Sequence, residues 1–469
     1  MKFIILSLLL FVNTYSYSQN SEYIEIEGVL THEWGDSFDP KTNFSVVNYY
    51  FTFEDKTVQL DVSEKMKEQG PLEFWSGQRV IIKTKDNIHE KSLIKANLIK
   101  LVGDKSGNNV TDVTGAQPWV SIACKFSDIS TEPENQQYFQ DMYANSPGGL
   151  DHYWREVSYN KVNVVGSIAI DWINLPSTQT TYVSTPGSGT TADLSLLFTD
   201  CTNAADSMVD FSDSGNGQSF VGINMMFNAS LDCCAWGGNR WATLDGVTKS
   251  WRVTWNPPWA FADEAVISHE MGHGFGLPHA NNSDQDSSPY DSPWDVMSAA
   301  TSYAVNDVVY GRLGKHINSY HKDRLGWYEL SDKLILTTNV NSDNTIIIDE
   351  TSLLSTTEYK MAQIILVDGS FYTIETRKKT GNYEANIVDN AVIIHHVVTG
   401  RQEPSWVIDE EQPPANFSDN EGVMWKVGET FTDLSNSLSI EVLSETTNGF
   451  EIRIIIDDLI FENSFESPL

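Results

Sequence analysis

The sequence has little positive charge, little cysteine and, after its first residues, no long apolar run. Lys and Arg number 30 against 64 Asp and Glu, a formal net charge of -34, which repels phosphate backbones and anionic lipid surfaces. This charge argues against nucleic acid as a partner. No stretch beyond the N-terminus reaches the roughly 20 apolar residues that a membrane-spanning helix needs, so we expect no membrane insertion.

The N-terminus is the one strongly apolar segment, and it has the layout of a signal peptide. Lys2 precedes an apolar stretch at residues 3–12, and a small-x-small cleavage site follows from Ser16 to Ser18. The stretch is too short for a membrane anchor. We predict a signal peptide over residues 1–18 and a secreted protein, whose oligomeric state the sequence does not indicate.

The four cysteines, Cys124, Cys201, Cys233 and Cys234, are expected to meet an oxidising compartment and to form disulfides. A bridge between the neighbours Cys233 and Cys234 is geometrically strained. We therefore predict one or two bridges that link this pair to Cys201 and Cys124. Zinc binding by four thiolates is the alternative, and the absence of C-x-x-C spacing argues against it.

The chain length of 469 residues predicts two to four domains. Residues 19–115 contain short alternating runs, which predict a small N-terminal β domain, with a barrel as one form of it, as a pro- or positioning module. Residues 104–117 are rich in Gly, Asn, Asp, Ser and Thr and suit a linker. Residues 116–332 mix α and β, and residues 333–469 return to short strands, which predict a C-terminal β-sandwich. The predicted fold class is multidomain α+β.

The expected elements follow from apolar periodicity and turn residues. The most informative is a helix over residues 263–275 with Asp263 as its cap. In the middle region we expect strands at 119–126, 162–170 and 220–227, and helices at 135–153 and 194–209. Elsewhere we expect strands at 23–29, 45–53, 79–83, 345–348, 361–367, 371–376, 392–398, 438–442 and 450–456.

The helix at 263–275 carries the pattern H-E-x-x-H. His269 and His273 are four residues apart, so on a helix they point from one face and can reach one metal ion. Glu270 lies one position further round the helix, beside the metal without being a ligand. A general base that takes a proton from a zinc-bound water needs that position.

A third histidine completes the set. Gly276 permits the sharp turn that brings the chain back to the same ion, Pro278 stops the helix from resuming, and His279 arrives as the third ligand. Three histidines leave the fourth tetrahedral position open, which is typical of catalytic rather than structural zinc. By chance, H-E-x-x-H-x-x-G-x-x-H arises in a chain of this length with a probability on the order of 10⁻⁵.

The stretch from Ser268 to His279 resembles the metzincin zinc-peptidase signature in full. Metzincins also have a methionine turn downstream, and Met297 is the candidate. The family implies that Met297 forms a hydrophobic floor beneath the zinc without binding it. The resemblance also implies a catalytic domain with a mixed sheet and a metal-binding helix. The substrate would lie along an edge strand of that sheet, with the metal helix behind it.

The wider resemblance, over roughly residues 117–398, is to secreted gametolysin-like and immune-inhibitor-A-like metallopeptidases. It rests on residues 153–159 (YWREVSY), 290–298, 325–327 (LGW) and 371–377 (FYTIETR).

Two features depart from other metzincin branches. Astacin-like and serralysin-like members place a tyrosine two residues after the methionine, where this chain has Ala299, so Tyr303 and Tyr310 are the conceivable substitutes. Matrix-type members silence the zinc with an N-terminal cysteine, and here no cysteine precedes Cys124. Any latency must therefore use another group or none.

Other candidate sites are less convincing. The stretch from His32 to Asp36 resembles half a zinc motif, and we interpret it as a surface turn. His395 and His396 adjoin in an apolar strand and face opposite sides, so they cannot chelate together. Residues 281–291 contain three aspartates, but they lack the spacing of a known calcium loop, so calcium is possible but unsupported.

The sequence therefore predicts a secreted zinc endopeptidase that acts on polypeptide substrates. Its expected zinc ligands are His269, His273 and His279, with Glu270 as general base. One alternative is a secreted binding or adhesion protein with a residual zinc site, although the intact Glu270 argues against decay. Another is a zinc hydrolase of cell-wall or glycan-linked substrates. The N-terminal domain is expected to lie across or near the cleft.

Overall fold

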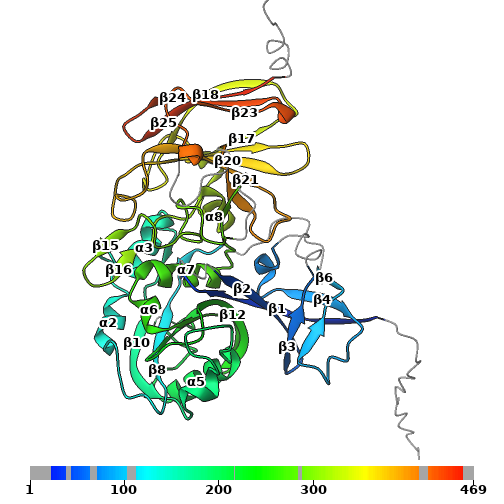
Figure 1. Ribbon diagram of the computed structural model, residues 1–469, viewed down its shortest axis with the longest axis vertical. Coiled ribbons are helices and arrows are strands. Elements are labelled where there is room, and N and C mark those ends of the chain that lie inside the picture. Colours follow the sequence, from blue (N-terminus) through cyan, green and yellow to red (C-terminus); the bar gives the residue numbers. More distant parts are fainter. Residues whose placement is uncertain are drawn as a thin grey trace, which may run out of the picture.

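The computed structural model describes residues 23–38, 44–63, 71–102, 112–215, 217–283, 288–410 and 421–457. The predicted signal peptide, most of the predicted linker and part of the 281–291 loop lie outside these residues. The described chain is a multidomain α+β protein, mostly sheet with few helices. In Figure 1 an N-terminal β unit lies beside a middle unit, and a C-terminal β unit lies above them.

The N-terminal unit is a small β structure around its own core, as its alternating sequence predicts. Leu30, Phe51, Val80 and Ile94 are among the side chains that fill this core. Its elements are β1 (Ile24–Asp36), β2 (Ser45–Phe53), β3 (Lys56–Asp61), η1 (Leu72–Trp75), β4 (Arg79–Thr84), β5 (Leu93–Lys95) and β6 (Leu98–Leu101).

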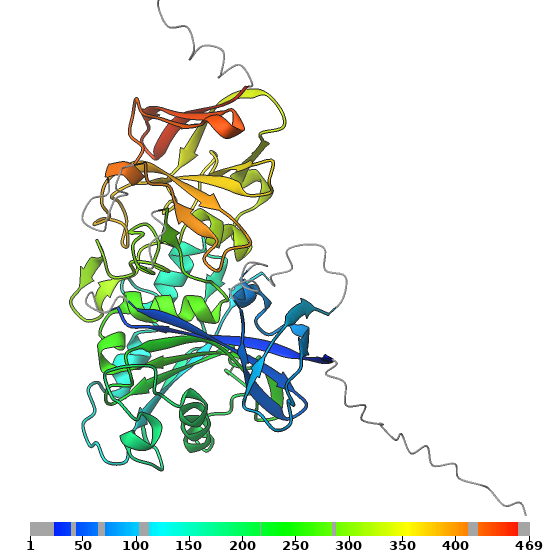
Figure 2. The ribbon, with the colours of Figure 1, turned by 45° about the vertical axis from the view of Figure 1, so that its right-hand side comes forward.

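Strand β1 is longer than the predicted strand at 23–29 and belongs to two units. Its first half pairs with β4, whereas Glu33–Asp36 pairs antiparallel with β12 (Ala235–Leu244) of the middle unit. β1 therefore extends the N-terminal sheet directly onto the edge of the middle sheet. Figure 2 shows it running along that edge beside α7 (Glu264–Gly274).

The middle sheet has the strand order β10-β8-β11-β13-β12. Its first four strands are parallel, and β12 returns antiparallel to β13. The predicted strands at 119–126 and 220–227 are confirmed, whereas the β12–β13 hairpin, which turns at Asp245 and Gly246, was not predicted. The strands are β8 (Trp119–Lys125), β10 (Ile168–Asn174), β11 (Gly222–Phe227) and β13 (Val247–Asn256). Short strands β7 (Gly115–Ala116) and β9 (Val162–Asn163) pair beside them, so the predicted strand at 162–170 is divided.

The helices confirm two predictions and correct a third. α7 and α5 (Leu194–Ala205) lie where periodicity placed them. The predicted helix at 135–153 is wrong, because the chain breaks between α2 (Gln136–Asp141) and α3 (Leu150–Val157). The break contains Gly148, whose φ of +91° is unfavourable for other residues. The remaining helices are α4 (Gln179–Tyr182), α6 (Pro258–Phe261) and α8 (Ser319–Arg324).

The C-terminal unit consists of two sheets that enclose one core, in agreement with the predicted sandwich. All six predicted C-terminal strands are present. One sheet contains β14 (Asn281–Asn282), β22 (Ser405–Val407), β21 (Ala391–Val397), β20 (Phe371–Arg377), β19 (Met361–Ile365) and β17 (Lys333–Thr337). The other contains β18 (Ser342–Asp349), β25 (Gly449–Ile456), β24 (Leu438–Glu445) and β23 (Thr430–Asp433). A separate hairpin joins β15 (Val305–Asp307) and β16 (Gly311–Leu313).

The cysteine pairing differs from the prediction. Cys124 is bonded to Cys201, and Cys233 to its neighbour Cys234. The first pair forms because β8 and α5 pack in one core, which brings the two Cα atoms to 6.0 Å. Cys233 and Cys234 are thus not linked to the other two, and the prediction that they would be is wrong.

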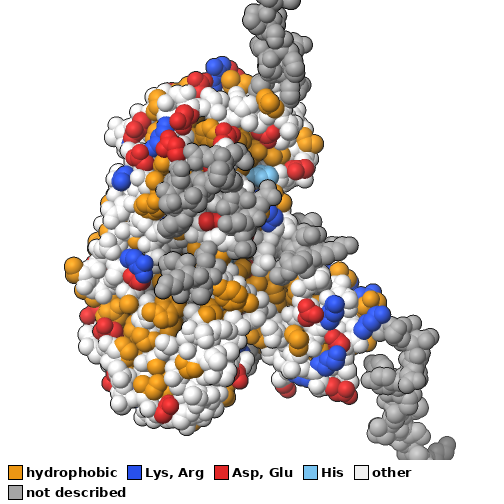
Figure 3. Space-filling model, in the orientation of Figure 1, with side chains coloured by type: hydrophobic (Ala, Val, Ile, Leu, Met, Phe, Trp, Pro, Cys, Tyr) orange, Lys and Arg blue, Asp and Glu red, His pale blue; other side chains and the backbone are white. Residues whose placement is uncertain are grey.

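The molecular surface differs between the units. On the face in Figure 3, Lys and Arg side chains gather on the N-terminal unit, while hydrophobic side chains spread over the middle unit. Exposed basic residues of the N-terminal unit include Arg79, Lys91 and Lys100. Across the described ranges, no helix is long and apolar enough to cross a membrane.

Candidate metal centre

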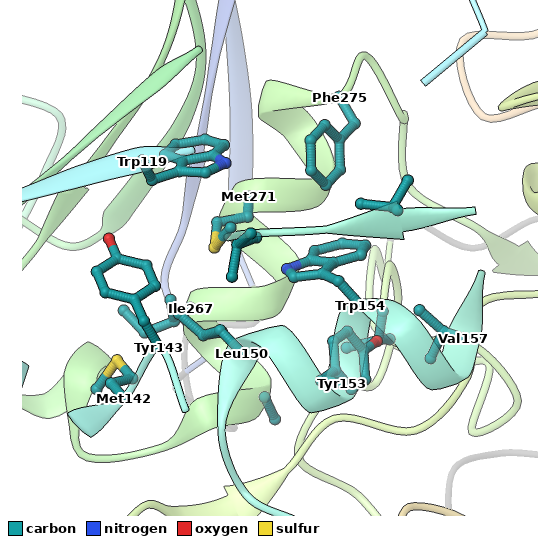
Figure 4. Close-up of a cluster of buried hydrophobic side chains, with 14 of the residues drawn as sticks. Trp119, Met142, Tyr143, Leu150, Tyr153, Trp154, Val157, Ile267, Met271 and Phe275 are labelled. Atoms are coloured by element: carbon teal, nitrogen blue, oxygen red, sulfur yellow. The ribbon is translucent and has the colours of Figure 1, made fainter. Parts of the chain in front are cut away.

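Helix α7 is the rigid support of the site. It is buried along its whole length and packs against β12 and β13. Figure 4 shows Ile267 and Met271 on its inner side, packed among Trp119, Trp154 and Phe275. The start of the helix is fixed separately, because the Glu264 carboxylate accepts hydrogen bonds from Ser268 Oγ and from the backbone N–H of Gly314.

The cap of α7 differs from the prediction. Asp263 occupies the N-cap position, but its side chain caps no backbone N–H of the helix. Its carboxylate instead forms an ion pair with Arg312 and accepts the backbone N–H of that residue. Asp263 thereby ties the helix start to the β15–β16 hairpin.

The three predicted histidines converge on one point. His269 Nε2 lies 3.0 Å from His273 Nε2 and 3.3 Å from His279 Nε2, and all three side chains are fully buried. His269 Nδ1 lies 2.7 Å from the Val296 carbonyl oxygen, and His273 Nδ1 lies 2.8 Å from that of Leu277.

These contacts determine the tautomers. A carbonyl oxygen only accepts, so both Nδ1 atoms carry the proton and both Nε2 atoms present lone pairs. Two facing lone pairs at 3.0 Å repel each other unless a cation lies between them. The donor set therefore fits a metal ion, with backbone carbonyls that fix the ring orientations, as is usual for metal-binding imidazoles.

The turn after α7 forms as the sequence predicts. Gly276 has φ of +90°, a conformation that glycine adopts at low cost. The Leu277 N–H returns to the Gly272 carbonyl at 3.0 Å, which turns the chain back toward the helix. His279 then reaches the same point as His269 and His273.

Met297 packs against α7, the helix that carries His269 and His273. It is fully buried, and a Cβ at Gly272 would collide with its sulfur, so α7 rests directly on Met297. The Asp295 carboxylate accepts the Met297 N–H at 2.7 Å and fixes this turn. The floor role that the resemblance implies for Met297 stays a prediction.

A fourth residue, Asp36, completes the cluster from the end of β1. Its Oδ1 lies 3.0 Å from His279 Nε2, and its Oδ2 lies 3.2 Å from His273 Nε2 and 3.5 Å from His269 Nε2. The three histidines and Asp36 are all buried and could hold a metal ion together. The earlier interpretation of residues 32–36 as a surface turn is therefore wrong, because they form a buried strand against β12.

The electrostatics of the cluster follow from burial and from the Asp36 charge. Burial opposes ionisation of Asp36, but the surrounding imidazoles outweigh it and hold its pKa well below the usual range. Burial lowers the pKa of His273 to about 3. For His279 burial also acts to lower the pKa, but Asp36 and Glu403 outweigh it and raise the value to about 9.

The Glu270 side chain lies next to the cluster of Asp36 and the three histidines. It is fully buried, and neither carboxylate oxygen has a hydrogen-bond partner among the described residues. Burial, and secondarily the Asp36 charge, raises its pKa well above the usual value. Gly237 of β12 permits the close approach, because a Cβ there would collide with the Glu270 backbone and side chain. A buried carboxylate without a partner is costly, so it needs a function.

Aromatic side chains surround the cluster. Trp34 stacks on His273 at 5.3 Å between ring centroids, and Phe38 meets His269 edge-on at 4.8 Å. Tyr290 donates its hydroxyl proton to Asp36 Oδ1 at 2.6 Å. Burial, followed by the Asp36 charge, raises the pKa of Tyr290 well above 10.

The two tyrosines suggested as substitutes lie elsewhere. Tyr303 is 37% exposed, and Tyr310 packs against Tyr138 at 5.3 Å between ring centroids. Ala299 occupies the position at which astacin-like and serralysin-like metzincins have tyrosine. Its carbonyl oxygen accepts a hydrogen bond from Lys315 Nζ. In the sequence, Tyr290 is marked only as the first residue of the 290–298 stretch that resembles other metallopeptidases, and that resemblance implies no role for it.

The C-terminal unit also contributes. Glu403, between β21 and β22, has Oε1 3.7 Å from His279 Nδ1, and its Oε2 accepts from Asn281 Nδ2 at 2.9 Å. It thus orients the third histidine from outside. Glu403 could not be predicted as a site residue, since nothing in the local sequence distinguishes it from other acidic residues.

Within the described part of the chain, His395, His396 and Asp291 join no further group of potential metal ligands. His395 and His396 lie in β21, as predicted, with opposite exposure. Of the three aspartates at 281–291, Asp291 is buried and accepts the backbone N–H of Asn282, while the other two lie outside the described residues. No protein-family model, curated protein or solved structure matches this chain, so its function rests on the geometry of the buried Asp36, His269, His273 and His279 cluster.

Proposed function

We propose that this protein is a secreted, zinc-dependent endopeptidase that hydrolyses peptide bonds in extracellular proteins. The observation that carries the proposal is the convergence of three imidazole Nε2 atoms next to Glu270, a buried carboxylate without a hydrogen-bond partner among the described residues. A ligand set alone fits a structural metal as well. A free, ionisable carboxylate beside it fits hydrolysis.

Zinc is the ion that best suits this donor set. Imidazole nitrogens with one carboxylate or an open position are typical of zinc, and three histidines are a known set in catalytic sites. When bound, zinc lowers the pKa of a coordinated water and polarises the substrate carbonyl. The full burial of the histidines and Asp36 keeps bulk water from these groups.

Glu270 supplies the acid–base chemistry. Its carboxylate accepts a proton from the attacking water and delivers it to the leaving amine nitrogen as the C–N bond breaks. Neither carboxylate oxygen of Glu270 is engaged by another described residue, so both are available for this proton transfer. The narrow gap at Gly237 fixes the carboxylate next to the edge strand on which a peptide would lie.

The substrate would bind along β12. This strand pairs with β13 on one side, and its other side is taken by the last four residues of β1. An extended peptide can add to such an edge through backbone hydrogen bonds. β1 therefore occupies the place that we assign to the substrate, and Asp36 occupies the position that the reacting oxygen requires.

The full chain would accordingly be a latent form. A substrate can bind only after Asp36 leaves the histidines and the end of β1 leaves β12. The contacts of Asp36 with the three histidines hold that end in place, so loss of the Asp36 carboxylate favours its release. In this proposal the N-terminal unit takes the first of the two roles expected of it, inhibitory or positioning, and Asp36 acts in place of the cysteine that this part of the sequence lacks. The predicted signal peptide and the two disulfides support an extracellular setting.

The test compares the full-length wild type with full-length Asp36→Ala on a mixed protein library, with and without a chelator, and maps new N-termini. We expect one zinc per chain, low cleavage by the wild type, more cleavage by Asp36→Ala and none with the chelator. Asp61→Ala, an exposed acid of the same unit, should behave as the wild type.

A second readout does not depend on activity. Because Asp36 lies within reach of all three histidines, its removal should change the visible absorption of the cobalt-loaded protein, whereas Asp61→Ala should not. Zinc-loaded Asp36→Ala protein that cleaves no polypeptide would contradict the peptidase proposal. Unchanged cobalt absorption would contradict the role of Asp36.

A further inference from the structure

We infer that Tyr290 is a catalytic residue of this site, whose hydroxyl donates a hydrogen bond to the substrate carbonyl oxygen as negative charge develops on it. This inference rests on the proposed peptidase function and names a donor that the metal motif does not contain. Its basis is the oxygen that Tyr290 binds in the closed chain.

That oxygen lies at the centre of the site. The Tyr290 hydroxyl is 2.6 Å from Asp36 Oδ1, and the same oxygen is 3.0 Å from His279 Nε2. The Tyr290 ring centroid is 5.6 Å from that of His279. The hydroxyl and the imidazole thus converge on a single oxygen atom.

The Asp36 carboxylate shares features with the reacting group. Addition of water to an amide carbonyl gives a carbon that bears two oxygens and negative charge, and a carboxylate also presents two oxygens and negative charge. One Asp36 oxygen contacts Tyr290 and His279, and the other contacts His269 and His273. In this comparison Tyr290 faces the oxygen that derives from the carbonyl.

Withdrawal of the N-terminal segment leaves the hydroxyl in need of an acceptor. The two acceptors of Tyr290 are Asp36 Oδ1 and the Phe44 carbonyl oxygen at 3.1 Å, and both belong to that segment. Tyr290 is 8% exposed while the segment is in place. Once both acceptors have left, its hydroxyl is available as a donor at the edge of the site, and a substrate oxygen that arrives at the Asp36 position restores one of the two lost hydrogen bonds.

Tyr290 itself is anchored independently of β1. Its neighbour Asp291 accepts the Asn282 N–H at 3.0 Å, and Ser292 gives its N–H to Ser298 Oγ at 3.0 Å. The Ala299 N–H returns to the Ser292 carbonyl at 3.2 Å. These contacts close the segment that also carries Met297, so Tyr290 stays in place when β1 leaves.

The proposed step is balanced as follows. The water oxygen bonds to the carbonyl carbon, its proton moves to Glu270, and the carbonyl π electrons move to the carbonyl oxygen, which Tyr290 stabilises. The C–O double bond then re-forms, the C–N bond breaks, and the nitrogen takes the proton from Glu270. Tyr290 keeps its own proton throughout. Removal of one such preorganised donor typically lowers kcat by about 10² to 10³.

The experiment uses full-length Asp36→Ala protein with Tyr290→Phe added, and Tyr303→Phe added as the matched control. We expect Tyr290→Phe to lower kcat by about 10² or more with KM changed less than about threefold. Affinity for a phosphinic peptide, a tetrahedral anion, should fall by a similar factor in calorimetry. Zinc content and Tm should match those of the Tyr303→Phe control.

The outcomes separate this inference from the peptidase proposal. If Asp36→Ala protein with bound zinc cleaves no peptide, the peptidase proposal fails and the inference fails with it. If cleavage occurs and Tyr290→Phe leaves both kcat and phosphinic-peptide affinity within about threefold of the control, only the role of Tyr290 is contradicted. Loss of zinc from Tyr290→Phe would also contradict it, since the residue would then support the metal site.

Discussion

The two β units flank the metal helix in different ways. The C-terminal unit meets the metal region through a buried ion-pair network. Arg377 of β20 pairs with Glu375 at 2.8 Å and with Glu384, and it donates to the Trp294 carbonyl at 2.6 Å, three residues before Met297. The N-terminal unit meets it through the backbone pairing of β1 and through the Asp36 carboxylate.

The difference shows which contact can be given up. Arg377, Glu375 and Glu384 are fully buried, so loss of one partner leaves uncompensated charge in the interior. The β1 contact consists of exchangeable groups, because another strand can pair with β12 and another oxygen can replace Asp36. We therefore regard the C-terminal unit as permanent support and the N-terminal strand as a removable cover.

The largest expected effect comes from breaking the permanent support. Arg377→Met should lower the free energy of unfolding by about 3–5 kcal/mol, because it leaves Glu375 and Glu384 as unpaired buried charges. Denaturant titration of the full chain measures this. Arg453→Met, which breaks an exposed pair with Asp343, is the control and should leave the free energy of unfolding nearly unchanged. Equal losses in the two variants would contradict the assignment of support to Arg377.

A smaller effect on stability is expected from Glu264, at the N-terminal end of α7. Burial raises the pKa of Glu264 to about 7 from 4.5. Between these pH values the Glu264 carboxyl is protonated in the folded state and ionised in the unfolded state. The contribution of Glu264 to stability is therefore greatest below pH 4.5 and is lost as pH rises through 7. The change is on the order of 3 kcal/mol.

Denaturant titrations across this pH range, on wild type and Glu264→Gln, test the effect. The wild type should lose stability relative to Glu264→Gln as pH rises, because the amide does not ionise. Parallel stability profiles of the two proteins would show that Glu264 titrates with an ordinary pKa in the folded state.

The smallest expected effect is a change in zinc affinity at His279. This histidine is contacted by Asp36 of the N-terminal unit and by Glu403 of the C-terminal unit. Glu403→Gln should weaken zinc binding by about tenfold, because it removes the charge that faces His279 Nδ1. Competition with a chromophoric chelator measures the affinity, and Glu358→Gln, on an exposed glutamate, is the control. Unchanged affinity would mean that Glu403 does not tune the third histidine.

The sequence revealed those parts of the site that local geometry determines. The helix at 263–275, the turn at Gly276 and the three histidines all follow from spacing over eleven residues. The C-terminal strands were predictable for the same reason, since alternation is a local signal. Local errors arose where loop residues interrupt a periodic run, as at Gly148 between α2 and α3.

The rest of the site depends on long-range pairing. Asp36 precedes His269 by more than two hundred residues, and only the register of β1 on β12 brings them together. Residues 30–36 do not alternate apolar and polar side chains and include His32 and Glu33, so no local pattern indicates that this half of β1 is buried. Tyr290 and Glu403 gave no local signal, since their roles depend on Asp36 and His279 across the fold.

The most direct test of the central claim is the effect of Glu270→Gln in full-length Asp36→Ala protein. The amide keeps the shape of the side chain but cannot act as a base. Zinc should remain bound by the three histidines, while peptide turnover should fall by about 10² or more. Near-normal turnover with zinc in place, or loss of the zinc itself, would contradict the account.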